Sequence, residues 1–360
     1  MLITNIITYA AQGAVFVEVQ TDSGISGFGE CSRVGEAVLE ELIHQVIKPL
    51  VLGQSPFGHA KLEQNVMNGK YKIAGQLLAM AFSGVEIACW DAAARSVGQP
   101  VYNLLGGRCR EEVKFYGSSM SRHLSAEEEA AKVLSSIEEY GFEAIKMKVG
   151  PRLGTGQAVD LEEDVRRVHV MREAIGPRMK LMLDANSSYS YTEAVRFYHF
   201  VKEADIYHYE EPCRYDDVQA YVKLAGQLPV PIHVGEQDWN LYTFRSFIAS
   251  GACQLYAPDV VKCGGIASAV RAAVLCRAFG VTYAPHNTSR GLGLAATLQL
   301  AAALPECSYY MEWKIGNDPS EAYLQAPLQL TGGRLNIPSG QGLGVEPDLE
   351  KMRRTMRVVD

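Results

Sequence analysis

The chain contains eight cysteines in 360 residues, but no two of them have CxxC spacing. Without paired spacing, neither a disulfide framework nor a zinc site is indicated, and reduced thiols of a cytosolic protein are the simpler expectation. The first ten residues lead directly into an alternating strand pattern. We therefore expect no signal peptide and a cytoplasmic location.

Long apolar runs and blocks of one charge sign are also missing. The longest apolar stretch, residues 73–90, is interrupted by Gln76 and Glu86, which favours a buried helix over a membrane span. The formal net charge of −7 argues against nucleic acid, which is bound by basic stripes. Hydrophobic residues make up 48% of the chain, as in ordinary globular proteins. We expect neither nucleic acid nor a membrane as a partner.

The first third of the chain changes from strand to helix periodicity. Residues 1–30 alternate β-forming residues with turn signals and predict an antiparallel sheet. Residues 34–50 then predict one amphipathic helix, and residues 75–97 a helix that is apolar nearly all round. The second helix is expected to be buried against another domain or another subunit, so a homo-oligomer is one expectation.

Strands alternate with helices from residue 113 onward, which favours an α/β fold with a parallel sheet closed as a barrel. One helix begins at Ser125, followed three residues later by Glu128, the pattern of a capping box. We expect an α+β domain over residues 1–112, a TIM-type barrel over 113–325, and a segment over 326–360 that returns to the first domain. The expected strands are VKFYGS, AIKMKV, KLMLD, IYHYE, PIHVGE, CQLYAPD, VTYAP and YYMEW.

Five charged or titratable residues each close a short apolar run, at intervals of about 25 residues: Asp184, Glu210, Glu236, Asp259 and His286. If the runs are parallel barrel strands, all five side chains emerge at one rim, where barrel enzymes carry their chemistry. Singly, each carboxylate is more often a strand-end cap or an ion-pair partner. Together, three carboxylates predict a site for Mg²⁺ rather than Zn²⁺, and the Asp–His pair predicts proton transfer.

The strand AIKMKV places Lys146 and Lys148 on one face and Ile145 and Met147 on the other. The outer face of a barrel strand meets helices, so both lysines are expected to point inward, although an exposed strand with solvated lysines is the alternative. Buried ammonium groups need anionic partners. Two adjacent cations also lower each other's pKa, which favours a lysine acting as a base.

Three further positions have weaker signals. Asn186 follows Asp184 closely and could support the metal shell or cap its loop, and Glu312 at the expected eighth strand end could orient substrate or be structural. For His169, His208 and His233 we expect core histidines that hydrogen-bond to the backbone.

The motifs KMK, LDAN, YEEP, VGEQ, PD…GG and PHN, in this order and spacing, resemble the mandelate racemase branch of the enolase superfamily. The N-terminal SGFGE and SGVEIACWDAAARSVGQPVYNLLGGR resemble its capping domain, so the resemblance spans nearly the whole chain. KMK alone would be uninformative, whereas the ordered set is highly specific. Muconate-lactonising and dipeptide-epimerase relatives carry a lysine where this chain has Asp259. An Asp paired with a later His is the racemase-branch pattern.

The resemblance implies a (β/α)7β-type modified TIM barrel with an α+β capping domain, and it implies roles for the matching residues. They are, as Mg²⁺ ligands, Asp184, Glu210 and Glu236; as acid/base groups on opposite faces of the substrate, Lys148 and His286, the latter backed by Asp259; and beside the substrate carboxylate, Lys146 and Glu312. Asn186 would contact the substrate. Two segments limit the transfer: TYAAQGAV is shorter than the substrate-covering loop of many relatives, and residues 55–72 would form the other specificity loop.

A small anionic carboxylate is therefore the expected partner. Removing the proton beside its carboxylate gives an enediolate, which a divalent cation and Lys146 would stabilise. Two opposed acid/base groups and a short first loop favour dehydration of an acid sugar, an aldonate or aldarate, to a 2-keto-3-deoxy product.

Other reactions use the same machinery. Racemisation or epimerisation of an α-hydroxy, amino or imino acid is the first alternative, and lactone cycloisomerisation is another. A non-catalytic ligand-binding barrel is the remote alternative. Class II aldolases are disfavoured because they bind metal through several histidines.

Overall fold

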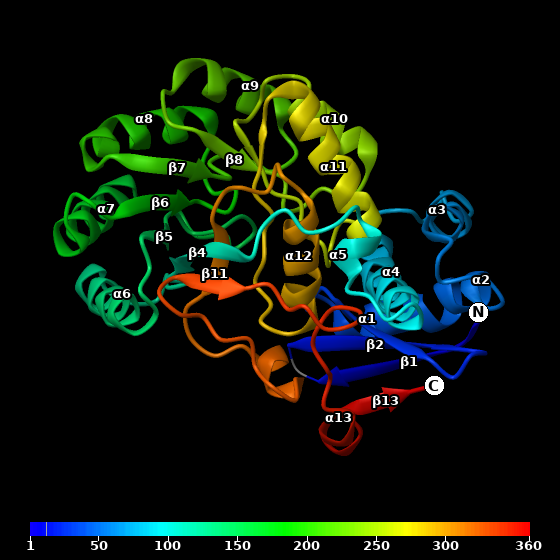
Figure 1. The fold of residues 1–360 in the computed structure, drawn as a ribbon. Helices are drawn as coiled ribbons and strands as arrows, with labels where there is room; N and C mark the ends of the chain where they lie inside the picture. Colours follow the sequence, from blue (N-terminus) through cyan, green and yellow to red (C-terminus); the bar gives the residue numbers. More distant parts are fainter. Residues whose placement is uncertain (12) are drawn as a thin grey trace.

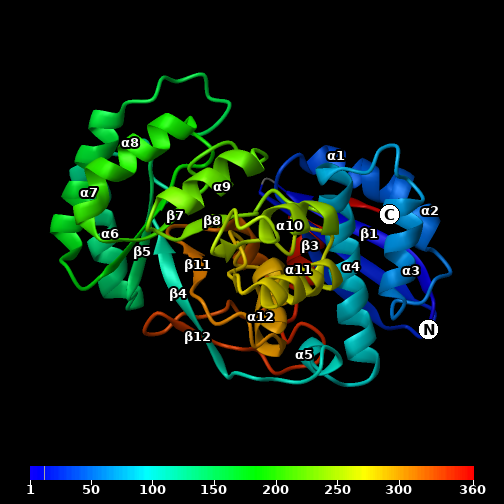
Figure 2. The ribbon, with the colours of Figure 1, turned by 90° about the horizontal axis from the view of Figure 1, so that it is seen from above.

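The computed structural model describes residues 1–11 and 13–360 and has two parts, an antiparallel sheet with its helices and a parallel barrel (Figure 1). The short connection expected from TYAAQGAV includes residue 12, which lies outside the described residues. Seen from above, the N-terminal sheet and helices lie on one side of the barrel, and the barrel helices α6–α8 lie on the far side (Figure 2).

The antiparallel sheet has the strand order β13-β1-β2-β3. Its strands are β1 (Ile3–Ala11), β2 (Ala14–Thr21), β3 (Ser26–Cys31) and β13 (Arg357–Val359). The first three form the meander that the sequence predicts, and Tyr9 of β1 lies opposite Phe16 of β2. The fourth strand comes from the other end of the chain and pairs antiparallel with β1.

Helical segments connect this sheet to the barrel. They are α1 (Glu36–Glu41), the π-helical η1 (Leu42–Ile47), α2 (Lys48–Val51), α3 (His59–Glu63), the π-helical η2 (Gln64–Asn68), α4 (Gln76–Ser96) and α5 (Val101–Leu104). The helix predicted over 34–50 is thus a continuous helical stretch with a π-helical centre. Pro49, which has no N–H to donate, lies two residues after that centre ends at Ile47. The segment 55–72, expected as a loop, is largely helical.

Helix α4 is the apolar helix that the sequence predicts. Within the described residues it is the one helix long and apolar enough to cross a membrane, but 89% of its most apolar window is buried in this structure. It packs mainly against β3 and β2. Its all-round apolar surface is therefore explained by contacts within the chain and needs no second subunit.

Glycines allow β3 to lie unusually close to α4. A Cβ atom added at Gly29 would stand 2.1 Å from the carbonyl oxygen of Gly84, and one at Gly27 would stand 2.2 Å from that of Ala88. No side chain fits at these distances, so the SGFGE motif is a packing requirement of the strand–helix contact. The contact fixes Glu30, the next residue of β3, which reaches the barrel.

The barrel part contains eight parallel strands among the described residues, joined by helices. The strands are β4 (Glu112–Ser118), β5 (Ala144–Lys148), β6 (Lys180–Asp184), β7 (Ile206–Glu210), β8 (Ile232–Val234), β9 (Leu255–Tyr256), β10 (Thr282–Tyr283) and β11 (Met311–Lys314). The order β10-β9-β8-β7-β6-β5-β4-β11 confirms the predicted α/β barrel architecture. In the described part of the chain no hydrogen-bonded ladder joins β10 to β11, so the barrel is not closed between these two strands.

The helices between the strands cover the outside of the barrel (Figure 1). They are α6 (Ala126–Tyr140), α7 (Leu161–Ile175), α8 (Tyr191–Val201) with the 3₁₀ turn η3 (Lys202–Ala204), α9 (Val218–Gln227), α10 (Leu241–Ile248), α11 (Ile266–Phe279) and α12 (Leu292–Ala303). The capping box of Ser125 and Glu128 at the start of α6 is confirmed.

The C-terminal segment contacts both parts. After η4 (Pro319–Tyr323), strand β12 (Arg334–Asn336) pairs antiparallel with barrel strand β4, whereas α13 (Leu349–Thr355) leads into β13 in the first sheet. The residues expected to return to the N-terminal part therefore first add a strand to the barrel.

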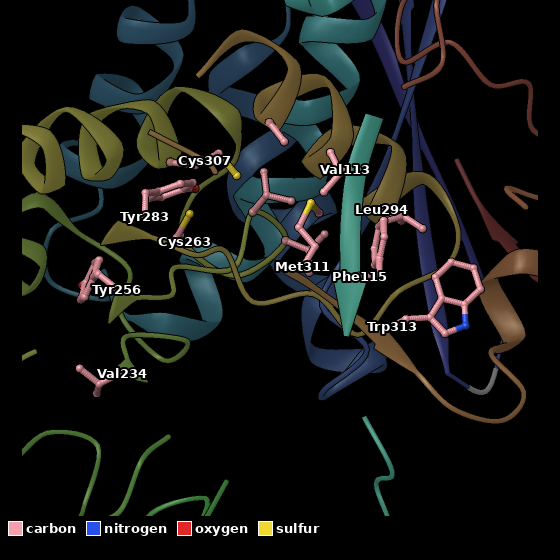
Figure 3. Close-up of a cluster of buried hydrophobic side chains, with 14 of the residues drawn as sticks. Val113, Phe115, Val234, Tyr256, Cys263, Tyr283, Leu294, Cys307, Met311 and Trp313 are labelled. Carbon is pink, nitrogen blue, oxygen red and sulfur yellow. The ribbon is translucent and has the colours of Figure 1, made fainter. Parts of the chain in front are cut away.

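The main hydrophobic core lies between the barrel strands and their helices and continues to the N-terminal part. Figure 3 shows a section of it, with Phe115 of β4 and Met311 and Trp313 of β11 close together. The rings of Phe115 and Trp313 meet edge to face with centroids 5.7 Å apart. Apolar side chains thus occupy the outer faces of the strands and leave their polar residues to the interior and the rim.

Candidate active site

The five residues that close the apolar runs all follow the carboxyl ends of parallel strands. Asp184 and Glu210 are the last residues of β6 and β7. Glu236, Asp259 and His286 lie in the loops after β8, β9 and β10, which end at Val234, Tyr256 and Tyr283. In the last two loops a proline precedes the polar residue, and proline has no N–H for a strand ladder. All five therefore reach one end of the barrel.

Lys146 and Lys148 point into the barrel, as predicted, and both are buried. The Nζ of Lys146 donates to Glu210 Oε2 at 2.8 Å and to Glu312 Oε2 at 3.1 Å, while the Nζ of Lys148 donates to Asp184 Oδ2. Burial lowers the pKa of Lys146, but the charges of Glu210 and Glu312 outweigh it and raise that pKa well above its ordinary value. The expectation that neighbouring lysines drive each other toward neutrality is therefore wrong for Lys146.

His286 and Asp259 form the predicted pair. The Nδ1 of His286 is 2.6 Å from Asp259 Oδ2, and its Nε2 is 2.9 Å from Glu236 Oε2. Burial lowers the pKa of His286, but the charge of Glu236 and the hydrogen bonds to both carboxylates raise it to about 10. Asp259 thus fixes the ring orientation and leaves Nε2 as the nitrogen that faces the site.

Lys148 and His286 line one cavity of about 340 Å³, together with Asn186, Glu236 and Asp259. Lys148 ends β5 and His286 follows β10, and four strands of the sheet separate them. The two nitrogen bases therefore approach a shared space from different sides. This is the arrangement that proton transfer on two faces of a substrate requires.

Of the remaining predicted residues, Asp184 and Glu312 are buried next to that pair, and Asn186 is half-buried. Asp184 contacts Lys148, and Glu312 Oε2 lies 3.8 Å from the Nε2 of His286. The other oxygen of Glu312 has no hydrogen-bond partner among the described residues. Asn186 adopts a left-handed backbone conformation, donates its N–H to Asp184 Oδ1 at 2.8 Å and accepts from Arg122 at 2.9 Å through its Oδ1. It orders the loop after β6 as well as lining the cavity.

The three predicted metal ligands lie at the same end of the barrel, but their ligand atoms do not all lie within 4.8 Å of one another. Each contacts a cation: Asp184 contacts Lys148, Glu236 contacts His286, and Lys146 lies 2.8 Å from Glu210 Oε2 and 3.7 Å from Asp184 Oδ2. The negative charge of the three carboxylates also affects the pKa of Glu211. Burial, followed by the negative charges of Glu236, Asp184 and Glu210, raises the pKa of Glu211 well above its ordinary value. Buried carboxylates crowded in this way, with oxygen donors only, fit a hard divalent cation.

Glu210 belongs to a tighter group of possible ligand residues. In the described part of the chain, His208, Glu210 and His233 are the residues whose ligand atoms all lie within 4.8 Å of one another. Glu210 Oε2 is already 2.8 Å from the ammonium of Lys146, which would repel a metal ion bound there. His233 Nδ1 lies 3.0 Å from Glu210 Oε2, and its Nε2 lies 3.2 Å from the Ala284 carbonyl oxygen. We interpret the group as hydrogen-bonded support for Glu210.

The prediction that three histidines are core residues bonded to the backbone is only partly correct. His233 contacts the backbone, as expected, but it also contacts Glu210. His208 contacts Tyr309 Oη at 3.0 Å instead of a carbonyl group. His169 lies exposed on α7, so its prediction as a core histidine is wrong.

The N-terminal part holds two of the barrel loops that carry site residues. Glu30 of β3 accepts hydrogen bonds from Ser289 Oγ at 2.8 Å, in the loop after His286, and from the Gly293 N–H at 2.7 Å, in the first turn of α12. Glu86 of α4 accepts from the Ile266 N–H at 2.7 Å, at the end of the loop that carries Asp259. These contacts join segments far apart in sequence, so the positions of Asp259 and His286 depend on both parts of the chain.

Sequence reasoning missed Lys262, which is buried beside the pair. Its Nζ lies 3.6 Å from Glu236 Oε1 and 3.9 Å from Asp259 Oδ2. It stands three residues after Asp259 in PDVVKCGG, so its proximity to Asp259 could have been read from the chain. A lone lysine in a loop has no signal of burial, however.

Replacing Glu30 by glutamine is expected to remove a pH dependence of stability. Burial is the main cause that raises the pKa of Glu30 to about 7, from an ordinary value of 4.5. Because the folded-state pKa is raised, the stabilising contribution is complete below pH 4.5 and is lost as the pH rises through 7. The loss is on the order of 3 kcal/mol. Urea denaturation of both proteins at pH 4.5 and pH 8 measures it.

Glu138→Gln, which removes an exposed carboxylate of α6, is the matched control. Wild type should lose stability relative to Glu30→Gln between the two pH values, and relative to Glu138→Gln it should not. Equal pH profiles for wild type and Glu30→Gln would show that Glu30 is ionised in the folded state at low pH.

Known proteins match nearly the whole chain. The family described as "Enolase C-terminal domain-like" matches residues 128–352, and the family "Mandelate racemase / muconate lactonizing enzyme, N-terminal domain" matches residues 2–106. D-galactarolactone cycloisomerase of Agrobacterium fabrum is 33% identical over 92% of this chain and 88% of its own length. D-galactonate dehydratase of Ralstonia pickettii is 30% identical over 97% and 92%.

The fold also matches solved structures over nearly the whole chain. The mandelate racemase/muconate lactonizing protein from Paracoccus denitrificans, solved in complex with magnesium, is 27% identical. It superposes with a TM-score of 0.93 over 99% of both chains.

Proposed function

Because the chain belongs to the mandelate racemase/muconate lactonizing branch of the enolase superfamily, we propose that it dehydrates an acid sugar. The substrate would lose the proton beside its carboxylate and the hydroxyl group of the next carbon as water. The enol that remains would tautomerise to a 2-keto-3-deoxy acid. The observation that carries the proposal is the shared cavity of Lys148 and His286, with three carboxylates behind them.

Charge is the main obstacle, because the enediolate places a second negative charge beside the substrate carboxylate. Mg²⁺ held by Asp184, Glu210 and Glu236 would supply positive charge beside the carboxylate oxygens. Lys146 adds a permanent cation, since its carboxylate partners keep it protonated. Groups fixed in place before the reaction stabilise developing charge at little reorganisation cost.

Lys148 and His286 would divide the proton transfers. One removes the proton from the α-carbon, and the other delivers a proton to the departing hydroxyl oxygen, so that water leaves from the other side. Asp259 holds the ring of His286 through Nδ1 and directs Nε2 toward the cavity. Burial of both groups keeps competing water away from the enediolate.

A screen of monoacid and diacid sugars with Mg²⁺ tests this proposal through the formation of a 2-keto product. We expect one or more of these acids to give a 2-keto-3-deoxy acid with the loss of one water. Incorporation of solvent deuterium at the α-carbon of such acids, without loss of water, would instead establish racemisation or epimerisation.

Lactone cycloisomerisation is a second candidate, favoured by the 33% identity to a D-galactarolactone cycloisomerase. The same base would remove the α-proton, and the ring oxygen would take the place of the departing hydroxyl. Ring opening of an acid sugar lactone without loss of water, and no reaction with open-chain acid sugars, would select this reaction over dehydration.

A further inference from the structure

The cavity has more positive charge than proton transfer and one carboxylate require. Its lining includes six lysines and arginines but three carboxyl residues. Lys148 and Lys262 have carboxylate partners in the site. The other four cations are Arg33, Arg122, Arg152 and Lys314, which we call the basic rim.

Two members of the basic rim share one carboxylate. Arg33 Nη2 lies 2.7 Å from Asp318 Oδ2, and Lys314 Nζ lies 3.9 Å from the same oxygen. That ammonium has no hydrogen-bond partner among the described residues, and its side chain is 23% exposed. Burial and then the charge of Arg33 lower the pKa of Lys314, so an additional anion there would be stabilised.

The other two members have no carboxylate partner within ion-pair distance among the described residues. The guanidinium of Arg122 donates to neutral acceptors, the Gly150 carbonyl oxygen at 2.8 Å and Asn186 Oδ1 at 2.9 Å. Arg152 is exposed and has a left-handed backbone with φ of 71°. Arg122 is half-buried, and a partly buried cation without a counterion is costly, so an incoming anion would relieve that cost.

Three members of the basic rim follow neighbouring barrel strands, and the fourth, Arg33, comes from the N-terminal part and donates to the Thr288 carbonyl oxygen at 2.8 Å. Lys314 ends β11, and Arg122 and Arg152 follow β4 and β5, which are consecutive strands in the order β5-β4-β11. Strands β9 and β10, which precede Asp259 and His286, stand at the far end of the ladder order but curl round to β11, where Glu312 Oε2 lies 3.8 Å from His286 Nε2. The basic rim lines the same cavity as Lys148 and His286, so a ligand with its reacting carbon between those two residues would have its other end within the field of these cations.

We propose that the substrate carries a second carboxylate and that the basic rim binds it, which makes the substrate a diacid. This inference rests on the proposed function, because it assumes that the first carboxylate lies beside Lys146. It concerns only the end of the ligand remote from the first carboxylate, because the hydroxylated carbons between the two ends are neutral. A monoacid with a terminal hydroxymethyl group would leave the basic rim without an anion.

Two pairs of six-carbon acid sugars test the inference, galactarate with galactonate and glucarate with gluconate. In each pair the members differ in the remote carboxylate. Dissociation constants are measured by calorimetry with Mg²⁺ in a Lys148→Ala background, where the ligand is not consumed. We expect one or both diacids to bind at least about tenfold more tightly than the matching monoacid, as one charge-assisted contact allows.

Lys314→Gln and Arg152→Gln together should reduce that preference to about twofold, because they weaken diacid binding more than monoacid binding, and each single variant should reduce it in part. Lys223→Gln removes an exposed lysine of α9 outside the cavity lining and should retain the full preference. The inference is overturned if no diacid is preferred, including the case in which none of the four acids binds, or if the double variant keeps the preference.

The outcome is separable from the proposed function. A diacid preference without any 2-keto product in the substrate screen would remove dehydration and retain the basic rim. If monoacids and diacids were both dehydrated and bound with equal dissociation constants, the proposed dehydration would stand and the role of the basic rim would be excluded.

Discussion

Replacement of Lys148 by alanine, or of His286 by asparagine, is expected to lower kcat on the substrate by at least about a thousandfold, the upper range for one acid/base group. Each variant removes one of the two nitrogen groups that line the cavity from different sides. Steady-state kinetics with the diacid or monoacid found by the screen measures the effect. Unchanged urea denaturation midpoints should show that both variants still fold.

Exchange of the substrate α-proton with solvent distinguishes the residue that acts as the base from the residue that acts as the acid. The variant that lacks the base should lose exchange of the α-proton with solvent deuterium, whereas the variant that lacks the acid should keep exchange and lose elimination. Arg166→Gln, which removes an exposed cation of α7, is the control and should retain kcat. Turnover near the wild-type rate in both site variants would show that neither residue transfers a proton.

Removal of divalent cations by a chelator is expected to reduce turnover by more than about a hundredfold, and added Mg²⁺ should restore it. The reason is that Asp184, Glu210 and Glu236 are buried carboxylates at one end of the barrel; burial first, and then their negative charges, raise the pKa of the neighbouring Glu211. Calorimetry with Mg²⁺ alone provides a second measurement that does not depend on turnover.

Glu210→Gln is the most informative ligand variant, because Glu210 contacts neither Lys148 nor His286 in this structure, unlike Asp184 and Glu236. It should weaken Mg²⁺ binding while both proton-transfer groups keep their partners. Glu138→Gln should bind Mg²⁺ as wild type does. Full turnover in excess chelator, or wild-type Mg²⁺ affinity in Glu210→Gln, would exclude these carboxylates as the cation site.

The sequence predicted the parts of the site that follow from strand periodicity. Alternation in AIKMKV placed both lysines inside, and the apolar runs before Asp184 and Glu210 end at the ends of their strands. The three shorter strands were less predictable, because glycine or proline ends the ladder before Glu236, Asp259 and His286. Those residues still reach the same rim, since a loop of two or three residues moves a side chain only a short way.

Contacts between distant segments were not predictable. Nothing in SGFGE indicates that Glu30 will meet Ser289, and nothing near Lys314 indicates that it will share Asp318 with Arg33. Such pairs depend on how the two parts pack, which a single sequence does not encode as a local pattern. His169 is different. Val168 and Met171 are buried one turn apart on α7, and this spacing places His169 off the apolar face, so its exposure was available from periodicity.

The pairing of β13 with β1 has a consequence for the order of events during synthesis. Residues 3–11 leave the ribosome early, but their outer neighbour is residues 357–359, so the edge of β1 stays uncovered until the barrel has been made. An open strand edge can pair with other chains during that interval. We expect the barrel to fold first and this sheet to close last, so closure would be slow, and the competing pairing between chains would increase with chain concentration.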